Sequence, residues 1–184
     1  MLDPAGPTYA LASNLRTPLH RFVTELIDHT QTYDIHQLAP HATVNWTSPR
    51  HALLRSTTPD ETELLLDADG YHLTGLAAFA EYDLQFYLST EPAFWRAQTP
   101  PTPAERICHL LTLNDSPRRI GYAMLLIEHL DIPAEGIRET ADDYGLTDHV
   151  DRIYAALTDT YPNSSDTLPS KTEYTQLKNQ YGVA

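Results

Sequence analysis

Apolar residues in the first part of the chain recur at helical spacing. Thr17 can cap a helix, and Pro18 suits the first helical turn. The residues that follow fall on one face at spacings of 3, 4, 7 and 8: Leu19, Phe22, Val23, Leu26 and Ile27. The pattern predicts a helix that ends near Thr30. A short strand is expected before it, over residues 8–12, and a brief helical turn after it, over residues 34–39.

The next segments predict short, partly buried elements. Residues 42–47 alternate, with Val44 and Trp46 on one side, which is typical of a half-buried strand. Residues 51–55 fit a strand or a helix. Residues 58–66 also fit both, because the segment starts with a helix-like Thr-Pro-Asp-Glu and ends in three consecutive leucines.

A strand, a helix of small residues and a second strand are expected before residue 100. Residues 71–74 lead into the helix over residues 75–81, and residues 84–88 are the second strand candidate. Four prolines within residues 92–103 indicate a connection between an α+β portion and a helical one.

The second half of the chain has clear helix signals. Thr102 and Glu105 have the spacing of a capping box, and Pro103 stands at the first helical position. Further helices are expected over residues 117–130, 133–144 and 148–157, the first of them buried because residues 120–127 are nearly all apolar. Gly145 stands where a left-handed cap residue would end the helix before it.

These elements predict an α+β protein with a small mixed α/β layer followed by a bundle of three or four helices. The expected divisions are an α+β domain over residues 1–100, a helical domain over residues 101–160, and a polar linker with a weak terminal helix over residues 161–184.

The charge balance narrows the class of partner. The chain of 184 residues has 12 basic against 25 acidic residues, a formal net charge of −13, and the acidic residues are spread along its length. Such a surface repels polyphosphate. It is typical of proteins adapted to high salt, where the screening length falls to about 3 Å at 1 M. A mimic of DNA or a binder of cationic proteins is the alternative interpretation.

The single cysteine, Cys108, cannot form a disulfide within the chain and indicates a reducing compartment. No segment approaches the roughly 20 apolar residues that span a bilayer. The first residues lack the basic start and apolar stretch of a signal peptide. A cytoplasmic protein without membrane association is expected.

Asp67 and Asp69 are the most suggestive pair of carboxylates. On a strand they would share one face and could hold the Mg²⁺ of a nucleotidyltransferase. Such an enzyme needs a glycine-rich turn upstream, and the chain has no glycine between Gly6 and Gly70. The sequence Asp-Ala-Asp-Gly at residues 67–70 therefore favours a turn.

Histidines and the cysteine offer no regular ligand or nucleophile pattern. His29, His36 and His41 are irregularly spaced. Cys108 stands beside His109 but among apolar residues, which favours a buried, inert thiol. No catalytic, cofactor-binding or metal-binding residue is predicted, and no cofactor is expected.

Two charged segments have simple interpretations. Arg118 and Arg119, at an expected helix start, could contact an anion, although surface salt bridges are the default. The acidic residues of the later helices indicate a solvated face: Asp142, Asp143, Asp148 and Asp151.

Three stretches carry a family resemblance. Residues 71–82 (YHLTGLAAFAEY) resemble a strand-to-helix segment of abortive-infection (AbiEi-type) antitoxins. Residues 42–53 (ATVNWTSPRHAL) and 116–126 (SPRRIGYAMLL) are similar to winged-helix transcriptional regulators of halophilic archaea. The resemblance covers about residues 8–160. Compared with the winged-helix regulators, residues 6–11 resemble only the last strand of the DNA-binding winged helix, so the recognition helix is expected to be missing.

The resemblance implies a regulatory or antitoxin-like module and argues against direct DNA binding. The sequence thus predicts a non-enzymatic module that binds a protein partner or itself, with the first helix and the helical surfaces as the candidate contacts. The alternative is a nucleotidyltransferase-like enzyme that uses Asp67 and Asp69 with Mg²⁺.

Overall fold

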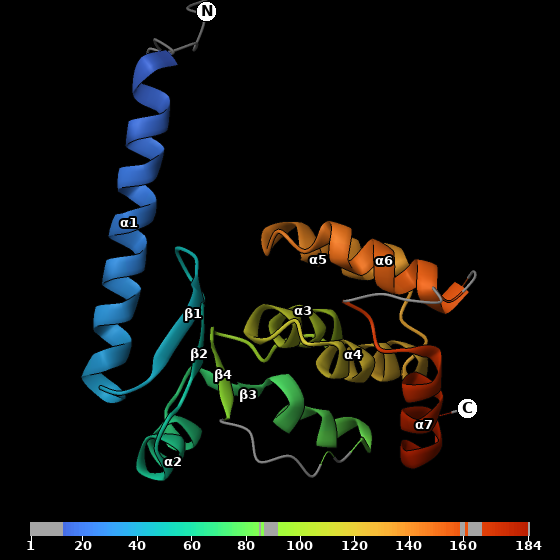
Figure 1. Ribbon diagram of the computed structural model, residues 1–184. Helices are drawn as coiled ribbons and strands as arrows, with labels where there is room; N and C mark the ends of the chain where they lie inside the picture. Colours follow the sequence, from blue (N-terminus) through green and yellow to red (C-terminus); the bar gives the residue numbers. More distant parts are fainter. Residues whose placement is uncertain (1–12, 85, 87–91, 159–160, 162–166, 184) are drawn as a thin grey trace, which may run out of the picture.

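The computed structural model describes residues 13–84, 86, 92–158, 161 and 167–183 and has the predicted α+β architecture (Figure 1). A small antiparallel sheet lies between a long N-terminal helix on one side and a group of helices on the other. The strand expected over residues 8–12 lies outside the described residues.

Helix α1, Ser13–Leu38, is longer than the sequence indicates. The predicted end near Thr30 and the separate turn over residues 34–39 were wrong, because the helix continues without a break. Its last turns are stabilised by tertiary packing: Ile35 is fully buried against the sheet, as is Ala39 directly after the helix. Pro18 lies inside the helix, close enough to its N-terminus that few backbone hydrogen bonds are affected.

The sheet has four strands in the order β1-β2-β4-β3, and every neighbouring pair is antiparallel. The strands are β1 (Thr43–Thr47), β2 (Ala52–Arg55), β3 (Tyr71–Thr74) and β4 (Ala93–Arg96). Strand β4 corrects the prediction that residues 92–103 only connect two portions. Its four residues pair with β2 on one side and with β3 on the other, and this pairing makes the segment a strand.

Two ambiguous segments and one strand candidate are settled by the structure. Residues 52–55 form a strand, whereas Pro59–Asp67 form helix α2, where the Thr58 hydroxyl accepts a hydrogen bond from the Glu61 amide at 3.3 Å. Residues Gly75–Tyr82 form a 3₁₀ helix, η1. In the candidate strand 84–88, Leu84 and Phe86 are not in a strand, and the other residues lie outside the described part.

The remaining helices follow their sequence signals closely. They are α3 (Pro103–Leu113), α4 (Pro117–His129), α5 (Ala134–Asp143), α6 (Thr147–Thr158) and α7 (Lys171–Tyr181). The predicted capping box of Thr102 and Glu105 is present, and Gly145 has the predicted positive φ of 67°. Helix α7 has a capping box of its own, formed by Ser170 and Glu173, and buries Tyr174. It is therefore better defined than the predicted weak helix.

Each face of the sheet has its own apolar cluster. One face packs against α1 and α2 through side chains that include Ile35, Leu54 and Phe94. The other faces α3 with Leu53, Trp95 and Ala97. The largest core lies between the helices. All residues of the predicted buried stretch 120–127 are buried there, together with three residues from before residue 100: Leu76, Phe79 and Leu84.

Candidate functional site

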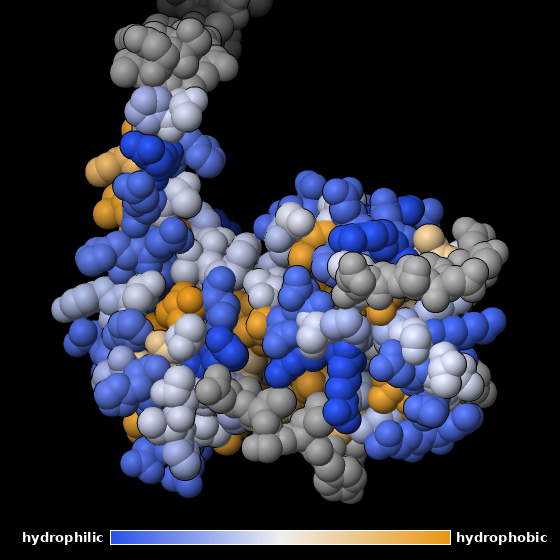
Figure 2. Space-filling model, in the orientation of Figure 1, coloured by the Kyte–Doolittle hydropathy of each residue, from blue (hydrophilic) through white to orange (hydrophobic). Residues whose placement is uncertain are grey.

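Helix α1, whose N-terminal half projects beyond the rest of the molecule, exposes a row of large apolar side chains (Figures 1 and 2). We call this row the α1 stripe. Its members, with their exposed fractions, are Leu19 (42%), Phe22 (60%), Val23 (44%), Leu26 (53%) and Tyr33 (60%). Large apolar side chains gathered on one exposed face are typical of an interaction site, because scattered single residues are normal but contiguous patches are not.

The opposite side of α1 attaches the helix to the sheet. The Gln31 amide nitrogen donates to the Pro49 carbonyl at 3.3 Å, and Thr47 donates to Asp28. A guanidinium on β4, that of Arg96, donates to Gln31 and lies 3.5 Å from an Asp34 carboxylate oxygen. At 100° of rotation per residue, Asp28 and Gln31 lie well over 90° from the centre of the α1 stripe, and Asp34 lies about 75° from it. The stripe therefore points away from the body of the protein.

A buried imidazole, which the sequence analysis did not single out as a site, joins the sheet to the helices. His109 on α3 is fully buried. Its Nδ1 lies 2.8 Å from the Thr74 hydroxyl, and its Nε2 lies 2.8 Å from the Tyr144 hydroxyl. The Trp95 ring packs against it with a centroid separation of 4.3 Å. Burial, with smaller contributions from Arg106 and His51, lowers the pKa of His109 to about 3.

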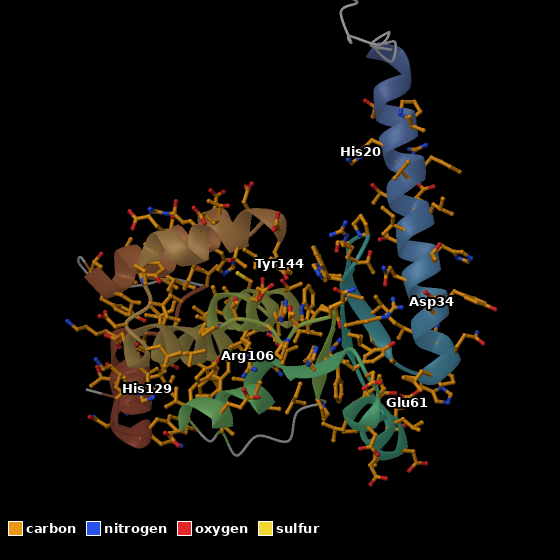
Figure 3. The ribbon with its side chains drawn as sticks, turned by 180° about the vertical axis from the view of Figure 1, so that it is seen from behind. His20, Asp34, Glu61, Arg106, His129 and Tyr144 are labelled. Atoms are coloured by element: carbon orange, nitrogen blue, oxygen red, sulfur yellow. The ribbon has the colours of Figure 1, made fainter. Side chains whose placement is uncertain are left out.

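His109 therefore stays neutral at ordinary pH and holds two hydroxyls in place. Burial raises the pKa of Tyr144 far above its usual range, so both partners remain uncharged. Figure 3 shows Tyr144 on the side of the helical part that faces the sheet. Its ring contacts that of Trp46 on β1, with centroids 4.6 Å apart. The cluster is enclosed by its own partners and is best explained as a structural connection between the layers.

An open hollow of about 610 Å³ lies beside α1, where the β1–β2 turn, the Asp69–Gly70 turn and the end of β4 meet. Its lining includes Arg50 and Arg96, together with the carboxylate of Asp69. Arg96 is already engaged by Gln31 and Asp34. Two further charged groups of the lining, Arg50 and Asp69, have opposite signs. The lining does not select an anionic or a cationic ligand.

The structure separates the two carboxylates that suggested a magnesium site. Asp67 is the last residue of α2, and Asp69 lies in the turn that follows; both are exposed. The turn interpretation is confirmed, and the two side chains do not share a strand face. Within the described ranges, no group of three or more His, Cys, Asp or Glu side chains could hold a metal ion.

The other candidate residues are also dispersed. His29 and His41 are exposed, and His36 lies with its Nε2 3.0 Å from the Ala42 carbonyl oxygen. Cys108 is fully buried, as predicted, and burial raises the pKa of its thiol to about 12. Such a thiol supplies very little of the reactive thiolate.

Arg118 and the acidic residues of the later helices lie on the surface, whereas Arg119 is partly buried. Arg118 donates to the Tyr122 hydroxyl at 2.8 Å, and burial lowers the pKa of Arg119. The predicted solvated face is confirmed, because all four of its residues are exposed: Asp142, Asp143, Asp148 and Asp151. Among the helices of the described chain, none is both long enough and apolar enough to cross a membrane.

Comparison with known proteins places most of the chain in one family. No curated protein and no solved structure matches the sequence. A family model described as HVO_2833_C, C-terminal, matches residues 68–183. The matched segment is more than half of the chain and runs from the turn before β3 to the end of α7; it does not include α1, β1, β2 or most of α2. The chain therefore belongs to the HVO_2833 C-terminal domain family.

Proposed function

We propose that this protein is a non-enzymatic regulatory or antitoxin-like module that acts by binding another protein chain through the α1 stripe. The observation that carries the proposal is the position of the stripe. Its five large side chains are 42–60% exposed and point away from the body to which α1 is attached. The resemblance of residues 71–82 and its neighbours to antitoxins and winged-helix regulators supports a regulatory role.

The energy available at the stripe is large enough for specific binding. Complete burial of a Leu, Val or Phe side chain contributes about 1.5–3 kcal/mol relative to an exposed one. Because the five side chains are already about half buried, covering them would contribute on the order of 5 kcal/mol. A partner would add its own apolar surface to this figure.

The rival nucleotidyltransferase receives no comparable support. It would use Asp67 and Asp69, and these exposed carboxylates have no third ligand among the described residues. We also infer that the module works in the cytoplasm, since its single cysteine, Cys108, is buried as a free thiol.

Cross-linking in the cells that express the protein tests this function. A photoreactive phenylalanine analogue at position 22, in the stripe, should form a covalent adduct with a protein chain. The same analogue at position 20 is the control, because His20 lies on the side of α1 toward the body (Figure 3). If positions 19, 22 and 26 all yield no protein adduct, the proposal is wrong.

A further inference from the structure

We infer that the partner bound by the α1 stripe is the α1 stripe of a second copy of this chain, in antiparallel orientation. This inference rests on the proposed function and names its partner. Four observations carry it: the spacing of the stripe, its place on a free side of α1, the charge of α1, and the position of the body on α1.

The spacing of the stripe is that of a helix-pairing surface. Leu19, Leu26 and Tyr33 are separated by seven residues, and Phe22 follows Leu19 by three. These residues occupy the a and d positions of a heptad, the positions that pack between two paired helices. His29 occupies the next d position and is exposed as well.

The stripe lies on a free side of the helix. Its a and d positions form a seam that suits a second helix, and Val23, at the neighbouring e position, widens the exposed apolar face to about 100°. In Figure 2 the apolar atoms of the projecting helix lie along its outer edge, away from the body. Among the described residues, no other element packs on that edge, so a second helix can lie along it without meeting the rest of the same chain.

The low net charge of α1 permits two copies of the acidic chain to bind each other through this helix. Helix α1 has two arginines and three acidic residues, so it holds only one of the 13 net negative charges, and the rest of the sequence holds twelve. Its Arg21 and Glu25 are also within 3.6 Å of each other along the helix. Contact between two α1 helices therefore avoids most of the repulsion that close contact between the two acidic bodies would have.

The orientation follows from where the acidic body is attached. The C-terminal half of α1 carries the body, through Ile35 and Leu38. A parallel pair would place both bodies at the same end, whereas in an antiparallel pair with Phe22 opposite Leu26 the two Ile35 residues lie about 33 Å apart along the axis at 1.5 Å per residue. That separation exceeds the screening length of about 8–10 Å at 0.1–0.15 M salt several-fold.

In the antiparallel register that pairs a positions with d positions, Phe22 packs against Leu26 of the second copy. The same register sets Leu19 opposite the histidine at position 29 of the second copy. Each pair occurs twice because the two copies are related by a two-fold axis. The seam is short, so the dimer should be reversible and dependent on protein concentration.

Sedimentation or light scattering of the full chain over a range of concentrations tests the dimer. Wild-type protein should dimerise, and Phe22→Glu should raise the dissociation constant more than tenfold. His20→Glu is the matched control, since it places the same charge on the other side of the same helix and should leave the constant unchanged. Because Phe22 is 60% exposed, circular dichroism should show all three proteins folded. Wild-type protein that remains a monomer at millimolar concentration would overturn the inference.

Disulfide cross-linking tests the orientation. Chains carrying Phe22→Cys are mixed with chains carrying Leu26→Cys and oxidised; wild-type protein, whose Cys108 is buried, is the blank. The antiparallel register predicts disulfides between the two kinds of chain. In a parallel pair the two positions are offset by about 6 Å along the axis, and disulfides would instead join like chains. That result would overturn the antiparallel arrangement.

The two proposals fail in distinguishable ways. If position 22 cross-links in cells to a different protein and the purified chain is a monomer, the second-copy inference is wrong and the proposed function stands. If positions 19, 22 and 26 all form no protein adduct in cells and the purified chain is a monomer, both are wrong.

Discussion

His109 and Tyr144 are 35 residues apart in the sequence and are joined by a hydrogen bond of 2.8 Å between the imidazole Nε2 and the phenol oxygen. The bond ties helix α3 to the end of α5, and the Thr74 hydroxyl ties the other ring nitrogen to β3. One neutral side chain thus connects three segments of the family-matched region. A protonated ring would be unfavourable at this site, because it is fully buried and Arg106 and His51 lie nearby.

Acidification should therefore destabilise the protein in a window set by His109. Its pKa is about 3 in the folded chain and about 6.5 in the unfolded chain, so between these values the unfolded state binds more protons. The stabilising contribution is complete above pH 6.5 and is lost as the pH falls toward 3, on the order of 5 kcal/mol in total. Urea unfolding should show a loss of about 1.5–2 kcal/mol between pH 6.5 and pH 5 alone.

His109→Gln supplies the control for this pH dependence. Glutamine can keep hydrogen bonds to the neighbouring hydroxyls but does not titrate, so the variant should have a lower stability at pH 7 and a flatter profile between pH 6.5 and pH 5. His149 has a pKa that burial also lowers, so some slope should remain. A variant with the wild-type slope would show that another group produces it.

Removal of the Tyr144 hydroxyl should cost about 1–3 kcal/mol of unfolding free energy. Tyr144→Phe leaves a buried ring nitrogen of His109 without its partner, and an unsatisfied buried polar atom is costly. Tyr33→Phe removes the same atom from a side chain that is 60% exposed and should change stability by less than about 0.5 kcal/mol. Equal effects of the two substitutions in urea unfolding would contradict this account.

Local sequence signals predicted the helices of the second half because the deciding residues lie within each helix or beside it. Thr102 and Glu105 cap α3 by their own spacing, and Gly145 ends α5 with a positive φ. Strand β4 could not be predicted in this way. Its four residues precede a proline-rich segment, and only pairing with β2 and β3 makes them a central strand.

The α1 stripe and the His109 cluster also differ in how much of each the local sequence reveals. The spacing of Leu19, Phe22 and Leu26 is visible in the sequence, but whether that face is covered depends on how α1 meets the sheet. The partners of His109 come from segments 35 residues before and after it, so no local pattern could reveal them. The only local signal was a histidine inside an apolar helix.

The Arg106 side chain should be one of the larger single contributors to stability. The side chain is only 4% exposed, and its polar atoms have partners. It donates to the carbonyls of Ala78 and Pro101 and lies 2.8 Å from a carboxylate oxygen of Glu81. Arg106→Met keeps much of the volume but removes all of these bonds, and should cost about 2–4 kcal/mol. Arg138→Met is the control: its ion pair with Asp151 is half exposed, so its loss should change stability much less than the loss of Arg106. Chemical denaturation of both variants measures the two losses of unfolding free energy.

Two helical glycines should respond oppositely to alanine. Gly136 on α5 has only a Pro133 carbon at 3.8 Å from an added Cβ, so Gly136→Ala should stabilise the chain by about 0.5–1 kcal/mol. At Gly121 on α4 the added Cβ would lie 2.8 Å from a methyl carbon of Leu177 on α7. Leu177 must therefore shift, and because Pro169 lies 3.5 Å from the added Cβ as well, Gly121→Ala should destabilise the chain despite the gain in helix propensity.

Hydrogen exchange shows whether the lost stability lies in the contact between α4 and α7. Gly121→Ala should speed exchange of the α7 amides while those of α5 and α6 stay as in the wild type, because α7 packs on α4 at this point. Adding Leu177→Ala makes room for the new methyl group, so the effect of Gly121→Ala should be smaller in that background than in the wild type. An α7 that exchanges at the same rate with and without Gly121→Ala would mean that the close approach of Gly121 to Leu177 does not hold this helix in place.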